Sequence, residues 1–129
     1  MRRASAPLLV ALVFVVAACG DDAADPASLN SCGALADAGI TLLQDTLDLI
    51  DSMSAEELAA LNESADTPAV FTEFETRGDA LTARAGAIGC TDEEMNSLMA
   101  ARVDRLSSNS IFGQFLIESV RSGEGGFGE

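Results

Sequence analysis

The sequence predicts an all-α protein, a small antiparallel bundle of four to five helices stapled by one disulfide. Two patterns support this class. Apolar residues recur at steps of three and four residues over most of the chain, which is the spacing of one helix face. Alternation with a period of two, which marks a strand, never lasts more than a few residues. We expect the helices within residues 29–121, as one domain.

The first helix is expected over residues 29–52. Gly33 and Gly39 weaken its first half, because glycine costs a helix about 1 kcal/mol relative to alanine, so its start is expected to fray or kink. After one longer gap, its apolar positions follow steps of four and three residues: Leu29, Ala36, Ile40, Leu43, Leu47 and Ile50.

The second helix begins with a capping box. Ser54 can accept the backbone N–H three residues later, and Glu57 can reach back to the N–H of Ser54. This motif predicts a short helix over about residues 55–63, with Leu58 and Leu61 turned inward.

The third helix is expected over residues 68–88. Thr67 has the position of its N-cap, and Pro68 follows at the first helical position, where a missing N–H breaks no helical hydrogen bond. Gly89 can adopt the left-handed conformation that ends a helix. The inward positions keep the same rhythm: Phe71, Phe74, Gly78, Leu81, Ala85 and Ile88.

A second capping box, from Thr91 to Glu94, opens the fourth helix, and its early acidic residues suit the positive end of the helix dipole. Residues 107–110 break it, and a last helix is expected over about 111–121. The inward residues of these two helices are expected to be Met95, Leu98, Met99, Val103 and Leu106, then Ile111, Phe112, Phe115, Leu116 and Val120. Residues 122–129 are rich in glycine and are expected to form a disordered tail.

The N-terminus has the pattern of an export signal. Two arginines precede an apolar run over residues 8–18, which is too short for a membrane span of about 20 residues. The run ends in VAAC at residues 16–19, which resembles the lipobox of bacterial lipoproteins. The resemblance implies a signal peptide over residues 1–18, and a diacylglyceryl lipid on the sulfur of Cys19 as the only attached group. Ordinary cleavage with a free Cys19 is the alternative.

Residues 19–28 are then expected to carry the lipid and to form an acidic tether, kept extended by its charge. The remaining chain has five arginines against 21 acidic residues, a net charge of about −16. This charge repels nucleic acid and anionic headgroups, so we expect no nucleic-acid partner and membrane contact through the lipid alone. The expected location is the extracytoplasmic face of the cell membrane.

With Cys19 lipidated, Cys32 and Cys90 remain as a pair in an oxidising compartment, and a disulfide is the natural interpretation. Two buried thiols are the weaker alternative. The helix lengths agree with the disulfide: two antiparallel helices of about 20 residues each, joined at one end, bring these cysteines together at the other end.

The composition supports no enzyme. The chain has no His, Lys, Tyr or Trp. It therefore lacks the imidazole of a Ser-His-Asp triad, the amine of a Schiff base, the lysine of a P-loop, and the aromatic platforms common in carbohydrate sites. A hydrolase with two carboxylates remains the least favoured hypothesis.

Three groups of residues are candidate sites. Phe71 with Phe74, and Phe112 with Phe115, form pairs at i and i+3; we expect them in the core, with the lining of an apolar ligand site as the alternative. Arg84 and Arg77 are expected to pair with nearby carboxylates, with a bound anion as the alternative. An acidic stripe on the first helix is expected to be a solvated face and not a metal site, because helical carboxylates spaced this way rarely surround one ion: Asp37, Asp45, Asp48 and Asp51.

The leading functional hypothesis is a lipid-anchored, non-enzymatic module that binds or scaffolds another envelope protein. It depends on the anchor and on the catalytic exclusions. The alternative is a carrier or sensor of an apolar small molecule or lipid, held between helices near the phenylalanine pairs.

Overall fold

Five α-helices and two short 3-10 helices account for most of residues 25–66 and 68–123, the part of the chain that the computed structural model describes. No strand occurs in these residues, so the all-α class is confirmed. The elements in order are η1 (Pro26–Ser28), α1 (Cys32–Ser52), α2 (Ala55–Glu63), α3 (Ala69–Ile88), α4 (Asp92–Ala100), η2 (Val103–Arg105) and α5 (Ile111–Ser122).

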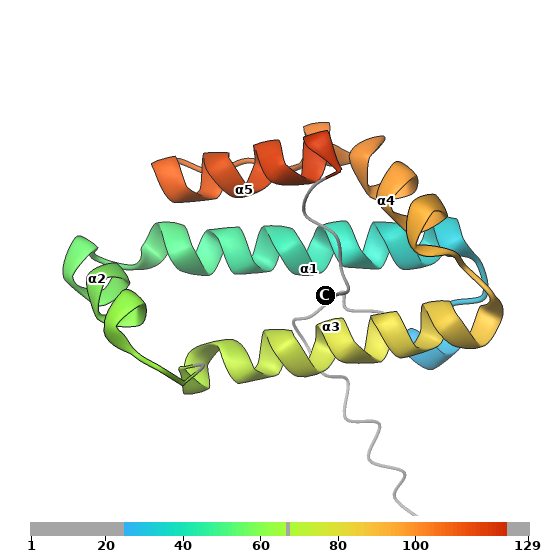
Figure 1. Ribbon diagram of the computed structural model, residues 1–129, viewed down its shortest axis with the longest axis horizontal. Coiled ribbons are helices and arrows are strands. Elements are labelled where there is room, and N and C mark those ends of the chain that lie inside the picture. The colour runs from blue at the N-terminus through green and yellow to red at the C-terminus, as the bar shows by residue number, and fades with distance from the viewer. Residues whose placement is uncertain (1–24, 67, 124–129) are drawn as a thin grey trace, which may run out of the picture.

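Helix α1 lies between α3 and α5 (Figure 1). The chain passes from α1 through α2 at one end and returns along α1 as α3, so α1 and α3 are antiparallel. Helix α4 packs near the start of α1, and η2 leads on to α5, which lies along the opposite side of α1 from α3. Within the described ranges, no helix combines the length and the hydropathy that a membrane span needs.

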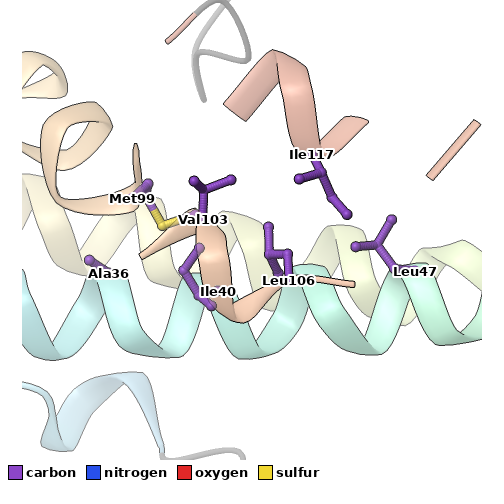
Figure 2. Packing of buried hydrophobic residues seen from close by; sticks show 7 residues of the cluster. All are labelled: Ala36, Ile40, Leu47, Met99, Val103, Leu106 and Ile117. Atoms are coloured by element: carbon purple, nitrogen blue, oxygen red, sulfur yellow. The ribbon is translucent and has the colours of Figure 1, made fainter. Parts of the chain in front are cut away.

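The core is built on two faces of α1. One face carries Ala36, Ile40 and Leu47 into a cluster with α4, η2 and α5 (Figure 2), where they meet Met99, Val103, Leu106 and Ile117. A second face, with the buried Leu35 and Leu42, is turned toward α3. The sequence pattern predicted the first face. It missed the second, because a helix packed on two sides needs two apolar stripes.

The capping signals place several helix ends correctly. Ser54 and Glu57 form both bonds of the capping box at the start of α2. At α4 only half of the predicted box forms: Thr91 accepts the N–H of Glu94 at 3.1 Å, but the Glu94 side chain makes no bond back to the Thr91 N–H. Gly89 ends α3 in the left-handed conformation, with φ of 84°.

Three boundaries differ from the prediction. Helix α1 begins at Cys32 because Ser31 accepts the N–H of Ala34 at 3.1 Å and caps it there. Leu29 precedes this cap and is not part of the helical seam. The last residues of the expected tether, Pro26–Ser28, form η1, capped by Asp25. Helix α3 begins at Ala69, with Pro68 as its N-cap and not as its first helical residue, and the predicted N-cap Thr67 lies outside the described residues.

The fourth helix is shorter than expected. It ends at Ala100, and Val103 and Leu106 reach the core from η2 and the residue after it. At the C-terminus, α5 includes Ser122, and Gly123 caps it with a left-handed φ of 75°. The rest of the predicted tail, residues 124–129, lies outside the described residues.

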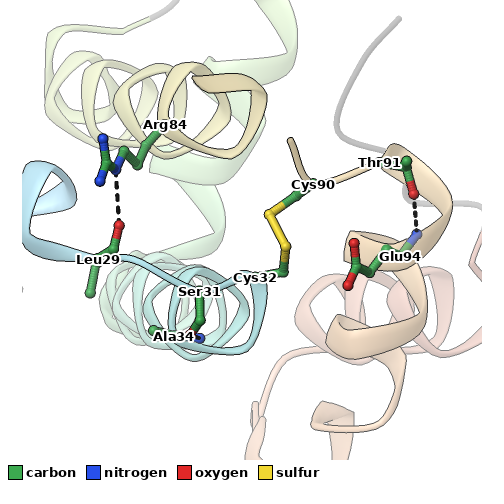
Figure 3. Close-up of a disulfide and its surroundings, with 8 residues drawn as sticks. All are labelled: Leu29, Ser31, Cys32, Ala34, Arg84, Cys90, Thr91 and Glu94. Atoms are coloured by element: carbon green, nitrogen blue, oxygen red, sulfur yellow. Dashed lines mark hydrogen bonds between the residues drawn. A yellow bond between two sulfur atoms is a disulfide. The ribbon is translucent and has the colours of Figure 1, made fainter. Parts of the chain in front are cut away.

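A disulfide joins the start of α1 to the second residue after α3 (Figure 3). The Cα atoms of Cys32 and Cys90 are 5.8 Å apart, and 58 positions separate them in the sequence. The predicted pairing is confirmed. Beside it, the guanidinium of Arg84 donates to the carbonyl of Leu29 at 2.9 Å and to the side chain of Asn30 at 2.8 Å. These bonds fasten the segment before α1 to α3.

Replacing both Cys32 and Cys90 by serine should lower the free energy of unfolding by about 4 kcal/mol, because the disulfide restricts the unfolded chain over a long loop. Urea unfolding followed by far-UV circular dichroism measures the change. The Cys19→Ser variant, which leaves this bond intact, is the control. An unfolding midpoint equal to that of the control would contradict the prediction.

Candidate functional site

Helix α5 presents an apolar face to solvent. The side chains of Ile111, Phe112 and Phe115 are 89%, 54% and 67% exposed. The expectation that Phe112 and Phe115 belong to the core is therefore wrong. In the described chain, the other large apolar residue with comparable exposure is Val70, at the start of α3. Three of these four residues thus lie within five positions on one helix.

The rotation of α5 about its axis is set by Gly113 and Ile117, which are both buried. These two residues are one helical turn apart and face α1. At 100° per residue, the opposite side of the helix carries Ile111, Phe112 and Phe115. We call these three residues the α5 patch.

Gly113 allows this close approach because it has no side chain. A Cβ at this position would overlap both the hydroxyl oxygen and the Cβ of Ser108, in the connection before α5. Ser108 cannot easily move away, because its hydroxyl donates to Asp51 at 2.6 Å. The glycine therefore fixes which side of α5 meets the protein and which side meets water.

Polar residues of α1 hold the connection between α4 and α5. Asp37 accepts hydrogen bonds from Arg102 at 2.7 Å and Arg105 at 2.6 Å. Gln44, seven residues on, exchanges two hydrogen bonds with the backbone of Ser107, at 2.9 and 3.0 Å. We call Asp37, Gln44 and Asp51 the polar line of α1.

Asp51 completes the polar line. It accepts the hydroxyl of Ser108 and the backbone N–H groups of Asn109 and Ser110, at 2.6, 2.7 and 3.2 Å. These bonds lower the pKa of Asp51, with the Ser108 hydroxyl as the main cause. Hydrogen bonds from Arg102 and Arg105 likewise lower the pKa of Asp37.

The acidic stripe is therefore not a simple solvated face. Asp37 and Asp51 hold the connection to α5, and Asp45 accepts from Arg77 at 3.4 Å. Asp48, which is exposed, accepts from Gln44 at 2.7 Å. In the described residues, the one set of three potential metal ligands in reach of each other is Cys32, Cys90 and Glu94. Its two sulfurs are joined in the disulfide and offer no thiolate.

The other predicted candidates have structural contacts. Phe71 and Phe74 are half-buried, with ring centroids 6.5 Å apart, and Arg77 lies 6.0 Å above the ring of Phe74. Arg77 pairs with a carboxylate as expected, that of Asp45 on α1. Arg84 binds backbone and amide oxygens near Leu29 instead of a carboxylate. The predicted lipidation site, Cys19, lies outside the described residues.

A cleft between α1, α3 and α4 was not predicted. Its volume is about 210 Å³. The buried Leu35, Gly39 and Met99 form its inner part. The remaining lining comes from α3, from Cys90 and from α4: Gly78, Leu81, Thr82, Ala85, Gly86, Cys90, Asp92, Met95 and Asn96. None of the four candidate phenylalanines lines it.

Small residues of α1 and α3 line part of the cleft. Gly39 on α1 faces Met99, whose sulfur would lie 3.0 Å from a Cβ at that glycine. On α3, a Cβ at Gly86 would meet no atom within 4 Å. The sequence contains part of the information, since the small residues Gly78 and Ala85 occupy inward positions of the predicted third helix. Periodicity alone does not separate a close helix contact from an open space.

Gly113→Ala should lower the free energy of unfolding by about 1–3 kcal/mol, because the new methyl group forces α5 away from Ser108. Gly86→Ala is the matched control. It adds the same methyl group to a helix where nothing lies within 4 Å, so it should raise stability by up to about 1 kcal/mol. Equal effects of the two substitutions in urea unfolding would refute the close contact at Gly113.

Asp51→Asn should lower the melting temperature at pH 7 and weaken its acid dependence. The folded-state pKa of Asp51 lies below its unfolded value. Its contribution to stability is therefore present above the unfolded value and is lost as the pH falls through the folded one. Melting curves from pH 7 to pH 2 should show the variant and the parent converging in acid. Asp79→Asn, which removes an exposed carboxylate of α3 instead, is the control, and an equal melting temperature of Asp51→Asn and the parent at pH 7 would contradict the prediction.

None of the family models, curated proteins or solved structures compared with the chain matches it. The functional argument is therefore built on the described residues themselves. Two features carry it: the α5 patch, and the cleft between α1, α3 and α4.

Proposed function

We propose that this protein is a lipid-anchored, non-enzymatic module of the cell envelope that binds another protein through the α5 patch. The observation that carries the proposal is the exposure of Ile111, Phe112 and Phe115 on one face of one helix. Soluble domains seldom leave large aromatic side chains together in water, and such groups are typical of protein-binding sites.

The charge distribution favours the same surface. Helices α1, α2, α3 and α4 each carry more acidic than basic residues, whereas α5 has one of each, Glu118 and Arg121. These two side chains pair with each other at 2.6 Å. The chain as a whole has a net charge of −14. Helix α5 is thus the α-helix without a net charge, so an apolar surface can dock on it without removing an excess of charge from water.

The same distribution specifies the partner's chemistry. The exposed Asp104 lies 3.5 Å from Arg121 of α5, so a surface that docks on this helix also approaches an exposed acid. We infer a partner with an apolar groove for the two phenylalanines and basic residues around it. The lipobox-like sequence ending at Cys19 supports a meeting place at the extracytoplasmic face of the membrane. The absence of His and Lys from the sequence supports a binding role over a catalytic one.

Photo-crosslinking in the native host tests this proposal, since amine-reactive reagents have no lysine to modify. A photoreactive residue at Ser119 lies on the same face as the patch, one turn after Phe115. We expect one discrete adduct that is lost, by at least tenfold, in the Phe112→Ser/Phe115→Ser variant. Burial of aromatic side chains usually dominates the affinity of an interface.

Two controls accompany it. Val70→Ser removes an exposed apolar side chain from α3 instead of α5, and the adduct should persist. Cys19→Ser should remove the adduct by releasing the protein from the membrane. An adduct that survives the double phenylalanine variant would exclude the α5 patch, and one that survives Cys19→Ser would exclude the need for the anchor.

A further inference from the structure

We propose that the cleft between α1, α3 and α4 binds a small apolar amine, with its alkyl chain between Leu35 and Met99 and its ammonium group at Asp92 and Asn96. This is a second binding site, on the other side of α1 from the α5 patch, and it does not depend on the proposed protein partner.

The inner part of the cleft suits an alkyl chain. Leu35 and Met99 are only 1% and 4% exposed, and both line the cleft together with Gly39, which Met99 contacts closely. Met95 also lines the cleft, and methionine side chains adapt readily to ligands of different shape. Because a cavity of about 150 Å³ can hold benzene, the volume here admits an alkyl chain of roughly six to eight carbons.

The outer part of the cleft carries polar groups that have no partner within the protein. Asp92 and Asn96 are one turn apart on α4, so their side chains share a face. In the described part of the chain, neither side chain makes a hydrogen bond or ion pair, although Asn96 is half-buried. A carboxylate and an amide oxygen together are acceptors for the N–H groups of an ammonium ion.

Charge decides against a carboxylate ligand such as a fatty acid. No arginine lines the cleft, and Glu93 and Glu94 follow Asp92 in the first turn of α4. A ligand carboxylate would meet this acidic group with no cation to receive it, whereas an ammonium ion would gain a charge-assisted hydrogen bond. The lining therefore selects a positive head group.

Titration calorimetry of the full chain, with its disulfide formed, tests the proposal with three probes of equal chain length: octylammonium, 1-octanol and octanoate. We expect octylammonium to bind most tightly, octanol more weakly, and octanoate at least tenfold more weakly than octylammonium. Equal affinity for octanoate and octylammonium would overturn the proposal.

Two pairs of variants locate the binding. Asp92→Asn should weaken the binding of octylammonium by about twofold to fivefold and leave that of octanol unchanged, as expected for an ion pair with an exposed carboxylate. Asp66→Asn also removes one negative charge, but before the start of α3, far along this helix from α4. It should change the affinity for neither octylammonium nor octanol. If both variants weaken octylammonium equally, the attraction is a general effect of net charge and the cleft is not the site.

Gly86→Leu fills the cleft from α3, because a Cβ at Gly86 meets open space. It should abolish binding of both octylammonium and octanol while keeping the protein folded, since leucine is a better helix former than glycine. Ala87→Leu adds a comparable side chain on the opposite, exposed side of α3 and should preserve binding. Unchanged binding in Gly86→Leu would overturn the proposal.

Discussion

Three polar side chains on α1, spaced seven residues apart, hold the connection between α4 and α5 along their helix. Asp37 accepts hydrogen bonds from two arginines, and Asp51 accepts them from a hydroxyl and two backbone N–H groups. Gln44 accepts the backbone N–H of Ser107 and donates to its carbonyl oxygen. The bonds to carboxylates are charge-assisted and stronger than neutral ones. With the connection fixed, Gly113 is the residue of α5 that fits against it. The outward direction of the α5 patch follows from these contacts on α1.

Much of the architecture could be predicted because its causes are local. The capping box at Ser54 and the left-handed Gly89 act within a few residues, and they placed the ends of α2 and α3 correctly. The disulfide followed from helix lengths and the cysteine positions. The early end of α4 was missed because its cause is distant. Arg102 and Arg105 bond to Asp37, 65 and 68 positions away, and the chain turns through η2 there.

The exposed phenylalanines show why the candidate site was harder to predict than the fold. Helix α5 has large apolar residues on almost every side, so its periodicity does not reveal which side is buried. The choice is made by Ser108, which leaves room only for a glycine. The cleft has a similar origin, since its lining comes from segments far apart in the sequence, α1, α3 and α4. In both cases the apolar pattern of one helix does not show which side is exposed or where a space remains. Contacts between segments that are distant in the sequence determine both.

The disulfide also determines how the protein would carry a mechanical load. Tension applied between the N-terminal segment and α5 enters at Cys32, crosses to Cys90 through the covalent bond, and continues through α4. The intervening 58-position stretch, roughly 200 Å of extended chain, is bypassed by a link only 5.8 Å long between Cα atoms. Helices α1, α2 and α3, which lie between the two cysteines, are therefore outside the covalent path of the force. Under tension, the segment to yield first is the non-covalently held half of the molecule, from α4 to α5.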